Sequence, residues 1–119
     1  MAQPAPYSSA IDLSLTRATA FLNGGDLNEA QAVCRDLLRR RPRWAPALHL
    51  SGLIAHRAGD LGKAIDLVGE AIAADDGVAA YHANLCELSR LAGRLDRAMD
   101  AGLHAVALDP GSALALNNL

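Results

Sequence analysis

Three copies of one short pattern, spaced 34 residues apart, constrain the fold of this chain more than any other feature. The copies read Gly-Asp-Leu-Asn-Glu-Ala at 25–30, Gly-Asp-Leu-Gly-Lys-Ala at 59–64 and Gly-Arg-Leu-Asp-Arg-Ala at 93–98. A fixed period of roughly 20–50 residues is typical of repeat arrays, in which each unit packs mainly on its neighbours. The period therefore predicts a row of similar units.

Each copy has the residues of a turn followed by the start of a helix. Its glycine can adopt the positive φ that closes a preceding helix, because glycine has no Cβ. Asp26 and Asp60 can then cap the next helix by accepting a hydrogen bond from its free N–H groups, whereas Arg94 cannot. The pattern therefore predicts a helix-turn-helix hairpin that recurs three times.

The period and the pattern resemble those of the tetratricopeptide repeat (TPR) family. Its signature has Trp-x2-Leu-Gly-x2-Tyr in the first helix, Ala-x3-Phe in the second and Pro after it. Ala30, Ala64 and Ala98 stand at the Ala position, and Pro42 and Pro110 at the Pro position. The resemblance implies an all-α, right-handed superhelical TPR solenoid of three repeats plus a partial fourth.

This frame divides the chain into a tail and one repeat domain. Residues 1–8 hold two prolines and little to bury, so a flexible N-terminal tail is expected there. The TPR domain, 9–119, would hold repeats at about 11–44, 45–78 and 79–112 and a partial repeat at 113–119. Apolar spacing and breaks predict helices at about 9–22, 27–40, 45–57, 61–74, 78–91 and 95–108.

Composition and charge argue against several classes of function. The formal net charge of −2 disfavours a nucleic-acid partner. No apolar run is long enough to cross a membrane, and the first residues do not resemble a signal peptide. Cys34 and Cys86 lack a C-x-x-C partner and are expected to be buried thiols. Without a catalytic or metal-binding motif, a cytoplasmic, non-enzymatic protein with no cofactor is expected.

The resemblance also implies where a ligand would bind. In the TPR family the first helix of each repeat lines the concave groove, and ligand contacts recur at i, i+4 and i+7 along one face. Carried over to this sequence, these places hold apolar, histidine, neutral polar and charged residues. A protein or peptide partner is expected to contact His49, Leu53, His56, Asn84, Glu87, Arg90 and Asn118.

Two binding modes of the family can be compared with these places. The clamp that holds the C-terminal carboxylate of chaperones uses Lys and Asn; the same places here hold Leu15, Thr19, Leu50, Ala80 and Asn84, so the clamp is absent.

The O-linked N-acetylglucosamine transferases carry an asparagine ladder whose amides can pair with an extended peptide backbone. Asn84 and Asn118 occupy that place, which Thr16 and Leu50 occupy in the earlier repeats. The alternative is that both are exposed polar residues.

Histidines and arginines allow further interpretations. His49 and His56 are seven residues apart, too far for the i, i+4 pair of a helical metal site, so a pH-sensitive peptide contact or a solvated residue is expected.

A basic cluster can complement the dipole of its helix, with partial neutralisation by acids of the helix at 61–74. The cluster consists of Arg35, Arg39, Arg40, Arg41 and Arg43.

Three functional hypotheses follow. The first is a non-catalytic protein–protein interaction module that binds its partner in the concave groove. The second is the N-terminal TPR region of a larger enzyme, such as an O-linked glycosyltransferase-like protein. The third is a self-assembly module that forms a homo-oligomer through residues 113–119, which are apolar and too short for a helix to be stable alone.

Overall fold

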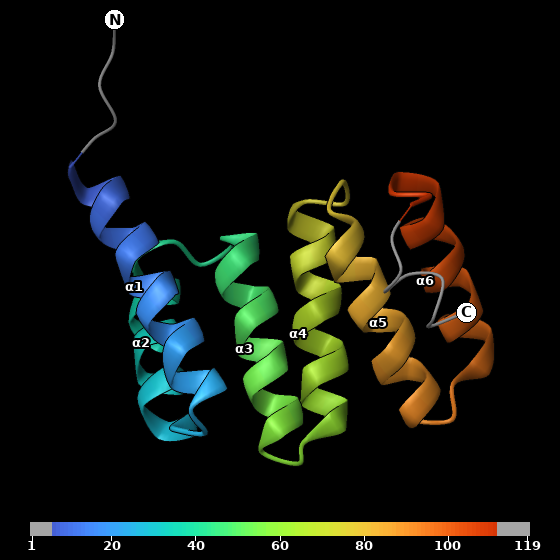
Figure 1. The fold of residues 1–119 in the computed structure, drawn as a ribbon, viewed down its shortest axis with the longest axis horizontal. Coiled ribbons are helices and arrows are strands. Elements are labelled where there is room, and N and C mark those ends of the chain that lie inside the picture. Colours follow the sequence, from blue (N-terminus) through green and yellow to red (C-terminus); the bar gives the residue numbers. More distant parts are fainter. Residues whose placement is uncertain (1–5, 112–119) are drawn as a thin grey trace, which may run out of the picture.

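The computed structural model describes the backbone of residues 6–111 and the side chains of residues 13–111. Asn118 and the predicted partial repeat at 113–119 therefore lie outside the described residues. Within the described part there are six helices and no strand, and Figure 1 shows them in chain order along the longest axis, with α2 behind α1. The helices are α1 (Pro6–Asn23), α2 (Leu27–Arg40), α3 (Ala45–Arg57), α4 (Leu61–Ala74), α5 (Ala79–Leu91) and α6 (Leu95–Leu108).

Helix α1 begins earlier than the sequence predicted. It starts at Pro6, whereas a tail up to residue 8 was expected from the prolines. Proline is compatible with the first helical position, because the N–H that it lacks would have no partner inside the helix there. Pro6 is therefore the first residue of the helix and not part of a tail.

The repeated glycines close the first helix of each hairpin, as predicted. Gly25, Gly59 and Gly93 have φ values of 82°, 90° and 76°. At the middle turn the N–H of Gly59 donates to the carbonyl of His56, and the N–H of Asp60 donates to the carbonyl of Ala55. These two bonds form a Schellman motif, which requires the left-handed conformation that glycine adopts without strain.

The predicted capping is correct at one helix and wrong at another. Asp60 Oδ1 accepts a hydrogen bond of 3.1 Å from the backbone N–H of Lys63 at the start of α4. Asp26 makes no side-chain cap bond at the start of α2. Its carboxylate lies beside Gly24 instead, where an added Cβ would stand 3.3 Å from Asp26 Oδ2. An aspartate at the capping position therefore does not by itself ensure that the carboxylate caps.

Small residues let the two helices of a hairpin approach closely. Ala30 and Ala64 are fully buried, and a Cβ added to Gly52 of α3 would lie 2.7 Å from Val68 Cγ2 and 3.1 Å from the Ala64 carbonyl oxygen. The core consists of such small groups and aliphatic side chains. Cys34 and Cys86 are buried free thiols within it, as predicted.

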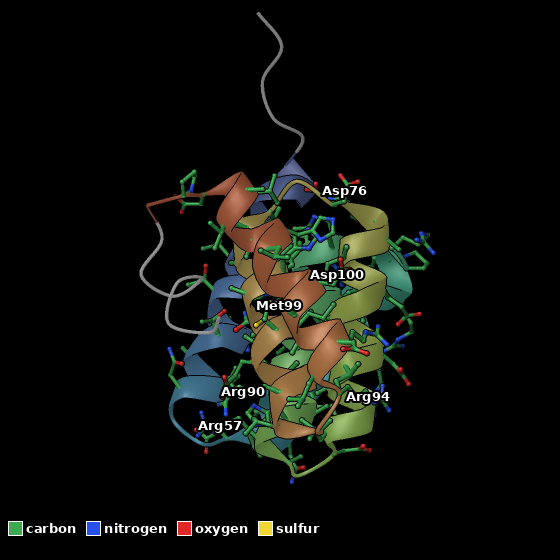
Figure 2. All side chains as sticks on the ribbon, turned by 90° about the vertical axis from the view of Figure 1, so that its right-hand side faces the viewer. Arg57, Asp76, Arg90, Arg94, Met99 and Asp100 are labelled. Atoms are coloured by element: carbon green, nitrogen blue, oxygen red, sulfur yellow. The ribbon has the colours of Figure 1, made fainter. Side chains whose placement is uncertain are left out.

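The order of contacts indicates how the row curves. The first helices of the hairpins, α1, α3 and α5, are called the A helices, and α2, α4 and α6 the B helices. Each B helix up to α4 packs on the next A helix, and α1 also contacts α3, whereas neither α3 and α5 nor α2 and α4 make an extensive contact. The contact between α1 and α3 favours the concave side for the A helices, as the TPR resemblance implies. Figure 2 views the row from its C-terminal end, with α6 nearest the reader.

Candidate functional site

The described candidate residues lie on two neighbouring A helices. His49, Leu53 and His56 follow each other at i, i+4 and i+7 along α3, and Asn84, Glu87 and Arg90 follow at i, i+3 and i+6 along α5. Each set lies along one side of its helix, because residues three or four positions apart are neighbours on a helix surface. Asn118 lies outside the described residues, so its position in the groove stays a prediction.

A direct hydrogen bond joins the two helices at His49 and Asn84. The distance between His49 Nε2 and Asn84 Nδ2 is 2.7 Å, although the residues are 35 positions apart. An amide nitrogen can only donate, so His49 Nε2 accepts, and the ring is neutral with its proton on Nδ1. One of the two amide N–H groups of Asn84 is therefore used inside the protein.

Burial changes the chemistry of His49. The side chain is partly buried, and desolvation lowers its pKa from 6.5 to about 4. A neutral imidazole is the form that the bond from Asn84 requires, so the burial and the hydrogen bond agree. The expectations of a solvated histidine, or of one that titrates near neutral pH, are therefore both wrong for His49.

Tyr81 completes this contact and was missed by the sequence analysis. Its ring centroid lies 4.6 Å from that of His49, with an angle of 35° between the ring planes. Tyr81 is buried and lies one turn before Asn84 on α5. That i, i+3 spacing was the available signal, since a residue three places from a candidate shares its side of the helix. Tyr81 and Asn84 together hold the His49 ring in one orientation.

Asn84 retains polar groups that can contact a ligand. Its side chain is partly exposed, and the bond to His49 occupies only one of its two N–H groups. The amide oxygen and the second N–H can pair with the N–H and C=O of a peptide backbone. Because His49 restricts the amide, less side-chain entropy is lost when a ligand binds.

Glu87 and Arg90 pair with each other. Arg90 donates from Nη2 to Glu87 Oε1 at 2.7 Å and from Nε to Glu87 Oε2 at 3.1 Å. The hydrogen bonds that Arg90 donates to the Glu87 carboxylate raise the pKa of Arg90. The pair is partly exposed, so its contribution to stability is small. The pair holds both charges in a fixed arrangement that a ligand can contact. Arg90 is labelled in Figure 2.

Leu53 and His56 differ in how they are held. Leu53 is partly buried and packs against the apolar cluster between α1, α2 and α3, which includes Leu22 and Leu50. The part of Leu53 that remains accessible offers an apolar contact one turn along α3 from His49. His56 is partly buried one turn further along α3. The candidate residues on α3 and α5 therefore combine polar, apolar and charged groups.

The basic cluster at the C-terminal end of α2 pairs with an acid of the same helix, whereas the sequence predicted acids of the helix at 61–74. Asp36 of the same helix lies 3.7 Å from Arg39 and 3.2 Å from Arg40, and the guanidinium of Arg41 lies 5.1 Å from the Trp44 ring centroid. No ion pair within residues 13–111 joins this cluster to the acids of α4. The pairing is local because i, i+3 and i, i+4 neighbours on one helix are the closest partners.

The remaining histidines form a separate contact between α5 and α6. The rings of His82 and His104 stack with centroids 5.4 Å apart, and each ring has a nitrogen 2.8 Å from a backbone carbonyl oxygen, of Asp76 and Asp100 respectively. His82 is buried. In the part of the chain that the structure describes, no group of three or more His, Cys, Asp or Glu residues could hold a metal ion. Nor does any described helix combine the length and apolar character of a membrane span.

These features define the class of fold. Three helical hairpins, positive-φ glycines at a constant period and small residues at the helix contacts form an all-α TPR solenoid. The TPR resemblance drawn from the sequence is therefore confirmed by the architecture.

Several solved structures are similar to this chain. A variant of the O-GlcNAc transferase of Thermobaculum terrenum matches with 30% sequence identity and a TM-score of 0.83, over 92% of this chain and 21% of that chain. The chain thus spans about a fifth of the length of that transferase. No protein-family model matches the sequence, and no curated protein matches it either.

Two further structures share the fold at lower identity. PcrH, solved in complex with the chaperone binding region of PopB, matches with 16% identity and a TM-score of 0.82, over 99% of this chain and 97% of that chain. The first TPR of Spaghetti (RPAP3), bound to an HSP90 peptide, matches with 14% identity and a TM-score of 0.85, over 92% of this chain and 86% of that chain. At these identities the likeness establishes the fold alone.

Proposed function

We propose that this chain is a non-catalytic protein–protein interaction module that binds a peptide or partner protein in the concave groove of its TPR array. The observation that carries the proposal is the partly exposed Asn84, held by the neutral His49 on the inner side of the stack. A polar amide fixed by His49, with the partly buried Leu53 one turn further along α3, matches the needs of a peptide, which offers backbone amides and side chains together.

The solved relatives support the same class of function. PcrH and the first TPR of Spaghetti (RPAP3) were each solved with a bound protein segment or peptide. Their fold is that of this chain, although their ligands do not transfer to it. A chaperone C-terminal peptide is not proposed as the ligand here, because Leu50 and Ala80 stand where the carboxylate clamp needs polar or cationic groups.

The proposed ligand is an extended segment that lies along the A helices. The amide oxygen of Asn84 accepts from a ligand backbone N–H, and its second N–H donates to a ligand carbonyl. Leu53 contacts an apolar ligand side chain, and the Glu87–Arg90 pair contacts charged ones. Asn118, one period after Asn84, is proposed to repeat the amide contact in the next unit.

Calorimetric titration of a peptide selected from a random display library tests the groove. Against wild type, Leu53→Glu is expected to weaken binding more than tenfold, because it places a charge in an apolar contact. Asn84→Ala is expected to weaken it about three- to tenfold, the usual worth of a neutral hydrogen bond. Leu13→Glu is the matched control, since Leu13 is an exposed leucine on α1 outside the candidate residues. Equal binding by Leu53→Glu and wild type would place the ligand elsewhere.

A second candidate function is favoured by the similarity to the O-GlcNAc transferase. At 30% identity over 92% of this chain, it supports the proposal that the chain is the N-terminal TPR region of a larger enzyme such as an O-linked glycosyltransferase-like protein. The array would then present a protein substrate to a catalytic domain further along the chain. Sequencing the gene beyond the codon for residue 119 tests this: a transferase domain in frame would support it, and an immediate stop codon would end it.

The uncovered face of α6 favours a third candidate, a homo-oligomer formed through residues 113–119. Leu95, Met99 and Leu103 recur at i, i+4 and i+8 along α6 and are each more than half exposed. Figure 2 looks onto this face, where Met99 is labelled. Light scattering tests the proposal: the mass should rise with concentration and fall to that of one chain on Leu116→Glu. A constant single-chain mass of the wild type would refute it.

A further inference from the structure

A second concavity lies on the opposite side of α3 from the candidate groove. It has a volume of about 780 Å³ and is lined from α2, α3 and α4. Its lining includes Ser51 and Ile54 of α3 and Ala58 directly after α3, which lie roughly half a turn around the helix axis from His49 and Leu53. The two B helices form its walls and α3 its floor, because α2 and α4 make no extensive contact with each other. We call this the convex cleft.

The convex cleft has an apolar interior. Ile54 and Ala55 of the floor are buried, while Leu38 of α2 and Leu67 of α4 are partly buried along the walls. Its volume lies within the roughly 300–1,000 Å³ of ligand-binding clefts. Apolar walls with remaining access to solvent favour a ligand that buries apolar side chains there.

The rim of the convex cleft is positively charged. Arg35, Arg57 and Lys63 line it, and within residues 13–111 none of the three forms an ion pair with an acid. The one acidic residue in the lining, Asp60, already accepts the capping hydrogen bond at the start of α4. Three cations and one acid give the lining a formal charge of +2, in a chain whose formal charge is −2. The rim therefore favours an acidic ligand.

The shape of the convex cleft favours a helix over an extended strand. Its α2 lining runs from Leu27 to Leu38, three turns, which is about 16 Å along the axis. The backbone N–H and C=O groups of the lining helices are largely used inside those helices, so they cannot pair with an extended ligand. A helical ligand satisfies its own backbone and needs only side-chain contacts, as in other helix-in-groove complexes.

We propose that the convex cleft is a docking site for an acidic amphipathic α-helix of a partner protein. The helix places its apolar stripe between α2 and α4 and its carboxylates opposite Arg35 and Lys63. This site is separate from the concave groove, because the two lie on different sides of α3. One chain can therefore hold a peptide on its inner side and a helix on its outer side.

Fluorescence anisotropy with a designed peptide tests the convex cleft. The probe is a labelled helical peptide of about 15 residues with Leu at i, i+3, i+4 and i+7 and Glu on the flanking positions. Its counterpart carries Lys in place of every Glu. The acidic probe is expected to bind at least tenfold more tightly than the basic one, and less tightly as salt is added, because charge attraction contributes to binding.

Charge-reversal variants locate the binding. The double variant Arg35→Glu/Lys63→Glu is expected to weaken binding of the acidic probe at least tenfold. Arg43→Glu/Arg94→Glu changes the net charge equally away from the cleft and should bind as wild type does. All four residues are exposed, so circular dichroism should report unchanged helix content.

Three results would overturn the proposal. The first is that the acidic probe does not bind, and the second is that the control double variant loses as much affinity as the cleft variant. The third is that Leu53→Glu abolishes binding while Arg35→Glu/Lys63→Glu retains it, because the probe would then occupy the concave groove. The concave groove is tested separately, by whether Leu53→Glu weakens binding of the display-selected peptide. None of the three results above affects that test.

Discussion

Acidification should destabilise this fold through His49 in a pH range above that of the carboxylates. The pKa of His49 in the folded chain is about 4, because burial disfavours the charged ring, and an unfolded histidine has a pKa of 6.5. Above pH 6.5 the ring is neutral in both states and the stability does not depend on it. Between pH 6.5 and 4 the unfolded chain takes up a proton that the folded chain does not, so the free energy of unfolding falls as the pH falls.

The size of the effect follows from the two pKa values. One pKa unit corresponds to about 1.36 kcal/mol, so the full loss approaches about 3 kcal/mol below pH 4. Between pH 7 and pH 5 the expected loss from His49 is about 2 kcal/mol. That is a large fraction of the stability of a small domain, which is typically about 5–15 kcal/mol.

Urea denaturation at several pH values, compared between wild type and His49→Gln, isolates this contribution. Glutamine offers an oxygen that can accept from Asn84 but does not titrate between pH 7 and 5. Since the other groups are common to both proteins, their effects largely cancel in the difference. Wild type should lose about 2 kcal/mol more than the variant on going from pH 7 to pH 5. Parallel stability curves for the two proteins would refute the buried, neutral state of His49.

Two further predictions concern packing. Gly52→Ala should destabilise the fold by about 1–2 kcal/mol, because overpacking against Val68 outweighs a helix-propensity gain of about 1 kcal/mol, while Gly62→Ala, with open space around its Cβ, should stabilise it by up to about 1 kcal/mol. Thermal unfolding of both variants tests this, and a higher melting temperature for Gly52→Ala than for wild type would contradict it. Ser89→Ala should raise the stability by about 1 kcal/mol, since the buried Ser89 hydroxyl has no hydrogen-bond partner among the described residues. Chemical denaturation measures it, and a destabilised variant would show that the hydroxyl does have a partner.

The repeat, the helices and the turns could be predicted because they depend on local spacing. Gly59 ends α3 through its own left-handed conformation, and Ala64 meets Gly52 because the hairpin has a fixed length. Such features recur every period wherever the residues recur. The limits of α1 were less predictable, since Pro6 can either end a tail or begin a helix.

The chemistry of the two concavities was decided only by the tertiary structure. His49 reaches Asn84 and Tyr81 because neighbouring hairpins stack in one register, and the burial that lowers the pKa of His49 comes from that stacking. The convex cleft exists because α3 holds α2 and α4 apart, so that Arg35 of the first repeat and Arg57 and Lys63 of the second line the same cleft. Periodic spacing specifies which side of a helix a residue occupies, whereas partners and burial depend on how separate helices meet in space.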